Sequence, residues 1–216
     1  LDRFMLNKIY LLNEKFETCF QKYDFHNLYK ELLNFCTVDL SAFYFDIRKD
    51  TLYCDPINSE KRKSCVMILN ILLKSLLRWF APILSFTTEE IYQLISKNNK
   101  SIHLEKFLKF PEKFKDEKLE VKWSELIKIR DVCNISIEEK RASKEIGSSL
   151  EADLEIKLNH KLFKLTKDTD FAELCITSKS VVKENNDEEV IVKTIKAKGN
   201  KCPICWKISE DACERH

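Results

Sequence analysis

Glycine is almost absent from this sequence: only Gly147 and Gly199 occur in 216 residues. Glycine adopts the left-handed conformations of tight turns and lets the backbone approach a phosphate closely. So low a content disfavours turn-rich all-β folds and glycine-rich phosphate-binding loops, and it favours long helices. Excess charge is also lacking, since 37 Lys and Arg face 35 Asp and Glu for a net charge of +2. Only a local basic patch would therefore indicate binding to nucleic acid.

No disulfide framework is visible, although the chain contains nine cysteines. An odd number without framework spacing indicates reduced thiols in a cytoplasmic protein. No signal peptide is recognised, and the first residues already follow a helical pattern, so we expect a fragment of a longer protein. The most apolar stretch, residues 65–84, contains Lys74 and Arg78, each of which would cost about 2.5–3.5 kcal/mol inside a bilayer. We therefore expect a helix of a soluble bundle and no membrane span.

Apolar residues recur at helical spacing through the first half of the chain. Four long helices are expected, at residues 1–21, 24–50, 59–82 and from about 87, with a loop at 51–58. Residues whose side chains accept backbone N–H bonds are placed to cap the last three helices: Asp24, Ser59, and Thr87 or Thr88. Long helices joined by short links predict a helical bundle, which we assign to residues 1–118.

The pattern changes after a fifth predicted helix at about residues 117–145, which Gly147 is expected to end. Apolar and polar residues then alternate with a period of two, which predicts strands. The expected strands lie around residues 154–158, 174–176, 181–182 and 190–195, with a turn at 185–189. We therefore expect a mainly α protein: the helical bundle, a long helix with a small α+β subdomain at residues 119–198, and a terminal module at residues 199–216.

The terminal module carries two close pairs of metal-binding side chains: Cys202 and Cys205, then Cys213 and His216. Two such pairs fit the tetrahedral coordination of zinc, because each two-residue spacer lets one tight turn direct two side chains to one ion. Four protein ligands leave no coordination position open for water, so we expect a structural zinc and not a hydrolase. Since His216 is also the last residue of the sequence, a fourth ligand beyond it is the second interpretation.

Four segments, in this order, resemble parts of one family of enzymes. Residues 41–53 (Ser-Ala-Phe-Tyr-Phe-Asp-Ile-Arg-Lys-Asp-Thr-Leu-Tyr) and 78–90 (Arg-Trp-Phe-Ala-Pro-Ile-Leu-Ser-Phe-Thr-Thr-Glu-Glu) are similar to the anticodon-binding domain of class I aminoacyl-tRNA synthetases. Residues 146–152 (Ile-Gly-Ser-Ser-Leu-Glu-Ala) and 202–206 (Cys-Pro-Ile-Cys-Trp) resemble the bacterial isoleucyl-tRNA synthetases. The resemblance covers essentially the whole chain. That family usually ends in a second Cys-x-x-Cys after a longer spacer, where this chain has Cys213 to His216.

The resemblance implies the C-terminal part of an isoleucyl-tRNA synthetase, the part that recognises the anticodon region of tRNA(Ile). The parent enzyme would join isoleucine to its tRNA through an adenylate made from ATP. The ATP-binding signatures of that catalytic core, of the His-Ile-Gly-His and Lys-Met-Ser-Lys-Ser types, are absent from these residues. We therefore expect this chain to bind tRNA(Ile) as a cytoplasmic monomer, and we do not expect it to aminoacylate tRNA alone.

Anticodon recognition needs surfaces on which unpaired bases stack, and cations that contact phosphates. Basic residues at the end of the second predicted helix and the start of the third are candidate phosphate contacts: Arg48, Lys49, Arg62 and Lys63. In the terminal module, Trp206 is a candidate stacking platform beside Lys207. Acidic neighbours dilute the basic group, so a solvated helix end is the alternative interpretation there. For Trp206 the alternative is a side chain that covers the small core of the module.

Without the resemblance, a function of another class stays open: a helical protein-interaction scaffold with a structural zinc ribbon. Long amphipathic helices and a closed zinc site fit this function as well as they fit RNA binding. The two hypotheses differ in whether RNA competes for the surfaces around Arg62 and Trp206.

Overall fold

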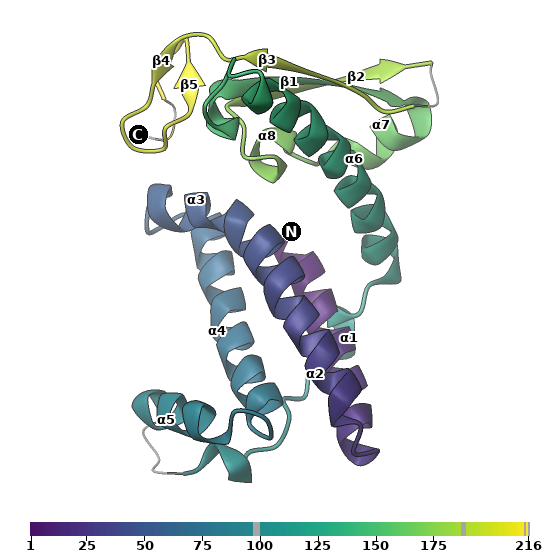
Figure 1. The fold of residues 1–216 in the computed structure, drawn as a ribbon, viewed down its shortest axis with the longest axis vertical. Coiled ribbons are helices and arrows are strands. Elements are labelled where there is room, and N and C mark those ends of the chain that lie inside the picture. The colour runs from purple at the N-terminus through teal and green to yellow at the C-terminus, as the bar shows by residue number, and fades with distance from the viewer. Residues whose placement is uncertain (97–99, 187–188, 214, 216) are drawn as a thin grey trace. The chain divides into compact units, whose positions relative to one another are not determined.

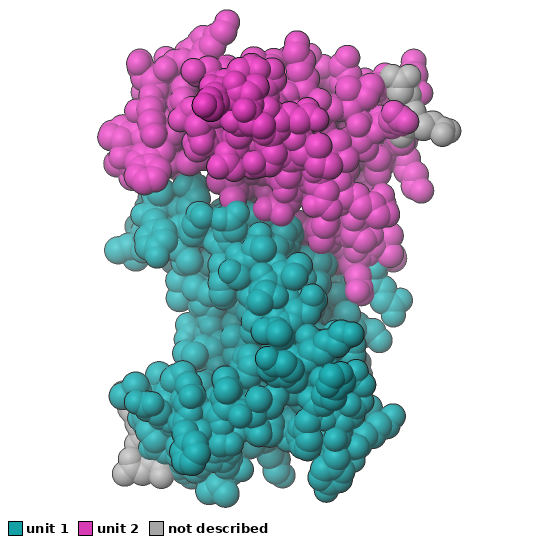
Figure 2. All heavy atoms as spheres, in the orientation of Figure 1, with its two compact units in different colours: residues 1–117 teal, residues 118–216 magenta. Residues whose placement is uncertain are grey.

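The computed structural model describes residues 1–96, 100–186, 189–213 and 215. The chain divides into two compact units, Leu1–Glu117 and Lys118–His216, which Figure 2 colours separately. The described part is mostly helical and includes a three-stranded and a two-stranded sheet. None of the described helices is long and apolar enough to cross a membrane. The finer division into three parts stays a prediction.

Unit 1 is a bundle of long helices. Its first helix, α1, spans Asp2–Gln21, and α4 spans Glu60–Phe80. Between them runs one continuous helical segment in three parts: α2 (Phe25–Asn34), the π-helix η1 (Phe35–Phe45) and α3 (Asp46–Cys54). Figure 1 shows this segment beside α1 and α4. All of these helices contribute large side chains to the buried core, among them Phe16, Leu32, Phe35, Tyr44, Leu72 and Trp79.

The second predicted helix is confirmed, and it is longer than expected. Asp24 caps it by accepting the backbone N–H of Asn27 at 3.2 Å, and Ser59 caps α4 by accepting that of Arg62 at 3.4 Å. Helical structure continues to Cys54, so the loop that was expected from residue 51 is shorter. Thr51, the first residue of this added turn, is buried, and its carbonyl accepts the N–H of Asp55 at 3.2 Å.

The predicted cap of the fourth helix is wrong. Helix α5 spans Ser85–Ile95, so Thr87 and Thr88 lie inside its first turn. The chain turns tightly after α4, because the carbonyl of Phe80 accepts the N–H of Leu84 at 2.7 Å. This turn brings Leu84 to the N-cap position, and Thr88 Oγ1 donates to the Leu84 carbonyl at 3.0 Å. Thr88 therefore bonds back into the turn and does not begin the helix.

The long helix α6, at Glu117–Ala142, confirms the fifth predicted helix. The link before it contains two short 3-10 turns, at Ile102–Leu104 and Glu112–Phe114. Gly147 does not end α6, contrary to expectation, because the left-handed position is at Lys144, with φ 60°. The N–H groups of Lys144 and Glu145 bond to carbonyls in the last turn of α6 at 3.0 and 3.1 Å. This pair of bonds is a Schellman motif, whose left-handed residue is usually glycine.

The larger sheet of unit 2 has the strand order β2–β1–β3. Strand β1 (Ala152–Asn159) pairs in parallel with β2 (Lys179–Asn185) and antiparallel with β3 (Ile191–Lys196). Alternate residues of β1 are buried, as the period of two predicted: Leu154, Ile156 and Leu158. Figure 1 shows α6 along one face of this sheet.

Two short helices connect β1 to β2: α7 at His160–Thr166 and α8 at Phe171–Leu174. The strand predicted at residues 174–176 is wrong, because Asp170 caps α8 and Leu174 is its last residue. Strands β2 and β3 flank β1 on opposite sides, so the chain crosses over between them. A turn was expected between these strands at residues 185–189, and of these, residues 187–188 lie outside the described residues.

Helices α1 and α8 end in the same way as α6. Tyr23 and Ile176 occupy the left-handed position at φ 55° and 56°. In each case the next residue closes the motif, since Asp24 and Thr177 donate to helix carbonyls at 2.8 Å. A chain with two glycines thus ends three helices on residues that carry side chains, each in a conformation that costs about 1–2 kcal/mol.

Candidate metal centre and candidate RNA interface

The terminal module is a small hairpin whose turn begins at Cys202. Strand β4 (Asn200–Lys201) pairs antiparallel with β5 (Ile208–Ser209). Two backbone bonds close the turn: the Trp206 N–H donates to the Cys202 carbonyl at 3.0 Å, and the Cys202 N–H donates to the Lys207 carbonyl at 2.8 Å. The backbone alone therefore gives this turn a defined shape.

Gly199, directly before β4, is the residue on which the hairpin depends. Its φ is 117°, and a Cβ built there would lie 2.1 Å from the carbonyl oxygen of Ser209. Real Cβ atoms do not approach a backbone oxygen so closely, so any side chain at Gly199 would push the two strands apart. The atoms nearest to a Cβ on Gly147 would be those at the end of the Glu151 side chain, the first being Oε1 at 3.4 Å.

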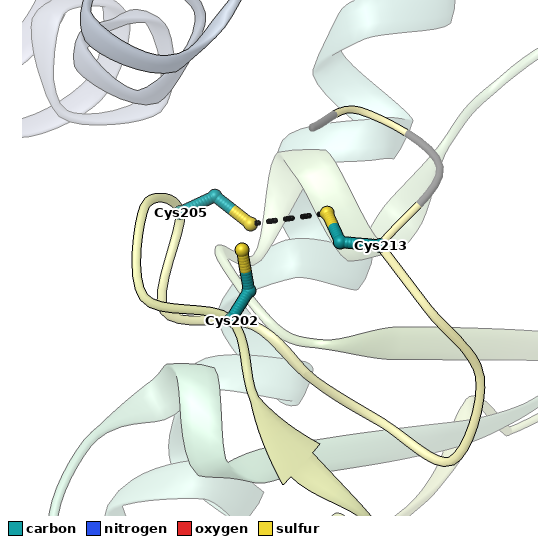
Figure 3. A group of neighbouring side chains, drawn as sticks. All are labelled: Cys202, Cys205 and Cys213. Atoms are coloured by element: carbon teal, nitrogen blue, oxygen red, sulfur yellow. Dashed lines mark hydrogen bonds between the residues drawn. The ribbon is translucent and has the colours of Figure 1, made fainter.

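Three thiols converge in this module, as Figure 3 shows. The Sγ atoms of Cys202, Cys205 and Cys213 lie within 4.8 Å of one another, and those of Cys205 and Cys213 are 3.8 Å apart. A tetrahedral zinc site with Zn–S bonds of about 2.3 Å has edges of about 3.8 Å, so the spacing of the thiols fits such an ion. The fourth predicted ligand, His216, lies outside the described residues.

The surroundings of Cys202 and Cys205 shift the pKa values of their thiols in opposite directions. Backbone N–H groups of Cys205 and Ile204 lower the pKa of the Cys202 thiol to about 7. Burial raises the pKa of the Cys205 thiol to about 11. Zinc binds the thiolate form, so a bound cation would offset the burial that keeps Cys205 protonated. The donor set therefore fits zinc in both its geometry and its chemistry.

Trp206 lies at the surface beside these thiols. It is 58% exposed, and Lys201 Nζ lies 5.3 Å from the centroid of its ring. Its neighbour Ile204 is also exposed, whereas Lys207 is half-buried. So exposed an indole favours the stacking interpretation over the one in which it covers the core. It presents a flat apolar surface next to a cation.

Of the four basic residues expected as phosphate contacts in unit 1, two are exposed. Lys49 and Lys63 each form an ion pair with a carboxylate of their own helix, at 2.6 and 2.8 Å. Arg48 has to be removed from this set, because its side chain is 5% exposed and its Nε donates to Asp2 Oδ1 at 2.9 Å. Arg62 is half-buried and donates to the backbone carbonyl that follows α3 at 2.7 Å, so it fixes the α3–α4 corner.

Tyr53, at the end of α3, was not predicted and is the most exposed aromatic residue of this corner. It is 84% exposed and lies four residues after Lys49, hence on the same face of the helix. The exposed Ile57 follows in the loop before α4. The signal in the sequence was an aromatic residue outside the buried stripe of its helix, at a position that core packing does not explain.

A match to a known family shows which class of protein this chain belongs to. Residues 2–157, from α1 into β1, match the family model described as the anticodon-binding domain of tRNA ligase. The chain therefore belongs to this family. The resemblance noted in the sequence is confirmed.

Within this class, the chain is similar to isoleucine–tRNA ligases. The chain is 67% identical over 216 residues to isoleucine–tRNA ligase of Pelagibacter ubique, covering 100% of this chain and 24% of that protein. It is 39% identical to isoleucine–tRNA ligase of Bradyrhizobium diazoefficiens, over 99% of this chain and 23% of that protein. It is 36% identical to isoleucine–tRNA ligase of Agrobacterium fabrum, over 98% of this chain and 23% of that protein. The chain thus spans about a quarter of the length of the curated relatives it matches.

Proposed function

We propose that this chain is the anticodon-recognising part of an isoleucine–tRNA ligase and that it binds tRNA(Ile). The observation that carries the proposal is the similarity of the whole chain to isoleucine–tRNA ligases, in addition to the family match. Aminoacylation, with its use of ATP, belongs to parts of the ligase outside these residues. The chain alone would bind tRNA as a cytoplasmic monomer without catalysing a reaction.

Two exposed aromatic side chains are the proposed stacking platforms, Tyr53 in unit 1 and Trp206 in unit 2. Stacking of one unpaired base on such a ring contributes about 1–3 kcal/mol. Lysines of the same two regions would contact phosphates: Lys49 in α3 and Lys63 in the first turn of α4, and Lys201 and Lys207 in the terminal hairpin. Arg62 acts indirectly, because its bond to the α3–α4 corner holds the helix end that carries Tyr53.

The proposed metal is a structural zinc. Cys202, Cys205 and Cys213 would hold it, with His216 as the fourth ligand. When bound, the ion cross-links the turn to the segment around Cys213. The role of these side chains is then to keep Trp206 directed outward, on a backbone whose own hydrogen bonds already define the turn.

Equilibrium binding of labelled tRNA(Ile), measured by fluorescence anisotropy, tests this function. We expect Tyr53→Ala and Trp206→Ala each to weaken binding roughly 5- to 150-fold, which corresponds to the loss of one stacked base. Phe86→Ala is the matched control, since Phe86 is an exposed aromatic residue on α5 outside both surfaces. The proposal is wrong if neither variant weakens binding, or if a tRNA with an unrelated anticodon binds equally well.

A further inference from the structure

One side of α5 is an exposed apolar stripe. It consists of four residues at helical spacing, of which Leu94 is 81% exposed: Leu84, Ile91, Leu94 and Ile95. At about 100° of rotation per residue, these positions fall within a sector of roughly 100° of the helix surface. This is the width of the apolar face with which a helix usually packs against a protein core. In α5 that face is turned to solvent.

The side of α5 next to the stripe fixes this orientation, because it carries the contacts to the rest of unit 1. Tyr92 packs against the buried cluster of Leu77, Ala81 and Ile102. Its hydroxyl donates to Glu105 Oε1 at 3.0 Å. Glu89 accepts the N–H of Ile102 at 2.9 Å, which ties the same side of the helix to the chain that follows it. Because these contacts hold α5 from its inner side, the stripe cannot turn inward without breaking them.

The charges on α5 decide between classes of partner. The helix contains two acidic residues, Glu89 and Glu90, and its sequence Ser85–Ile95 includes no Lys or Arg. RNA and anionic lipid surfaces are recognised largely through Lys and Arg. An apolar stripe on a helix of net negative charge instead suits an apolar protein surface, since contiguous exposed apolar patches mark sites of protein contact.

We propose that this stripe packs against another part of the same ligase polypeptide. The relatives are about four times as long as this chain, so in a ligase of their length most of the polypeptide would lie outside these residues. The inference rests on the proposed function in one respect, namely that the chain is part of a longer ligase. The stripe then is an internal interface, which couples the anticodon-binding bundle mechanically to the rest of the enzyme.

Amide hydrogen exchange in α5, compared between the complete ligase and this 216-residue chain, tests the inference. We expect the amides of α5 to exchange at least about tenfold more slowly in the complete ligase, because packing of the stripe suppresses local opening. In the ligase, Leu94→Glu should return the exchange toward the rate of the isolated chain. Leu94→Met should not, because it keeps an apolar side chain of similar volume. Val121→Glu, at an exposed position of α6, is the control for an added charge elsewhere.

Equal exchange of α5 in the two proteins would overturn the inference. So would protection that depends on the concentration of the isolated chain, since a second copy would then cover the stripe. Weaker tRNA binding by the Leu94→Glu chain would assign the stripe to RNA and would also overturn it. Failure of the proposed function is distinguishable: the chain would not bind tRNA(Ile), whereas α5 would still be protected in the longer polypeptide.

Discussion

Trp79 Nε1 donates a hydrogen bond to Asn13 Oδ1 at 3.0 Å, and this bond joins α4 to α1 inside the core of unit 1. Both residues are buried. The amide nitrogen of Asn13 donates in turn to the carbonyl of Leu108 at 2.9 Å, in the segment that follows α5. One buried side chain therefore satisfies polar groups from two other segments of the bundle.

Replacement of this asparagine should destabilise the bundle. In Asn13→Leu the buried indole N–H of Trp79 loses its partner, so we expect the free energy of unfolding to fall by about 1–3 kcal/mol. The carbonyl of Leu108 is only partly buried and should add less. Urea denaturation measures this change. Asn70→Leu, at an exposed position of α4, is the control and should change the stability by less than about 0.5 kcal/mol. Equal effects of the two substitutions would contradict the role of the buried bond.

The left-handed residue after α6 offers a stabilising substitution. Lys144→Gly removes the Cβ that disfavours φ 60°, so we expect the free energy of unfolding to rise by up to about 1 kcal/mol. Lys128→Gly, inside α6, should lower it by about 1 kcal/mol, because glycine is a poor helix former. Thermal unfolding of both variants gives the comparison. A loss of stability in Lys144→Gly would mean that the side chain contributes more than its conformation costs.

The two glycines provide a paired test of the metal centre. Gly199→Ala places a Cβ against the Ser209 carbonyl and disrupts the hairpin, so we expect the zinc content of the purified chain to fall well below one ion per chain. Gly147→Ala meets only the end of the Glu151 side chain and should retain zinc. Zinc is measured by a colorimetric chelator after denaturation. Equal zinc in both variants would show that the hairpin does not align the thiols.

Asp153 should make unit 2 less stable when its carboxyl group is ionised. Burial raises the pKa of its carboxyl group, and its Oδ1 has no hydrogen-bond partner among the described residues. A folded-state pKa above the unfolded-state pKa means that the folded state binds the proton more tightly. The free energy of unfolding therefore falls as the pH rises from the unfolded-state pKa to the folded-state pKa. We therefore expect Asp153→Asn to be more stable than the unchanged chain at pH 7, and the difference to vanish in acid. Thermal unfolding across this pH range, with the exposed Asp168→Asn as control, measures it; a difference independent of pH would exclude this cause.

The sequence predicted what depends on local patterns. Helical periodicity identified the long helices, short polar side chains identified the caps at Asp24 and Ser59, and spacing identified the three thiols. The failures involve information that is not local. Glycine statistics pointed to Gly147, but the left-handed residue is Lys144 because the last turn of α6 ends there.

The candidate RNA contacts show the same limit. A basic residue near a helix end is equally consistent with solvent and with a buried ion pair, and only the fold brings Asp2 against Arg48. Tyr53 was missed for the converse reason, since an aromatic residue in a helix is usually part of a core. Exposure, which decides both cases, depends on contacts between residues far apart in the sequence.

The π-helix η1 has a consequence for how this bundle tolerates changes in chain length. Buried residues, or adjacent buried pairs, recur every three or four positions in the segment from α2 to α3, except for one step of five between Phe35 and Leu40. The wider turns of η1 thus absorb one extra residue. Deletion of an exposed residue there, such as Val38, would restore a regular α-helix and leave the face of Lys49 and Tyr53 in place. The same deletion in a regular part of the segment would rotate everything after it by about 100°.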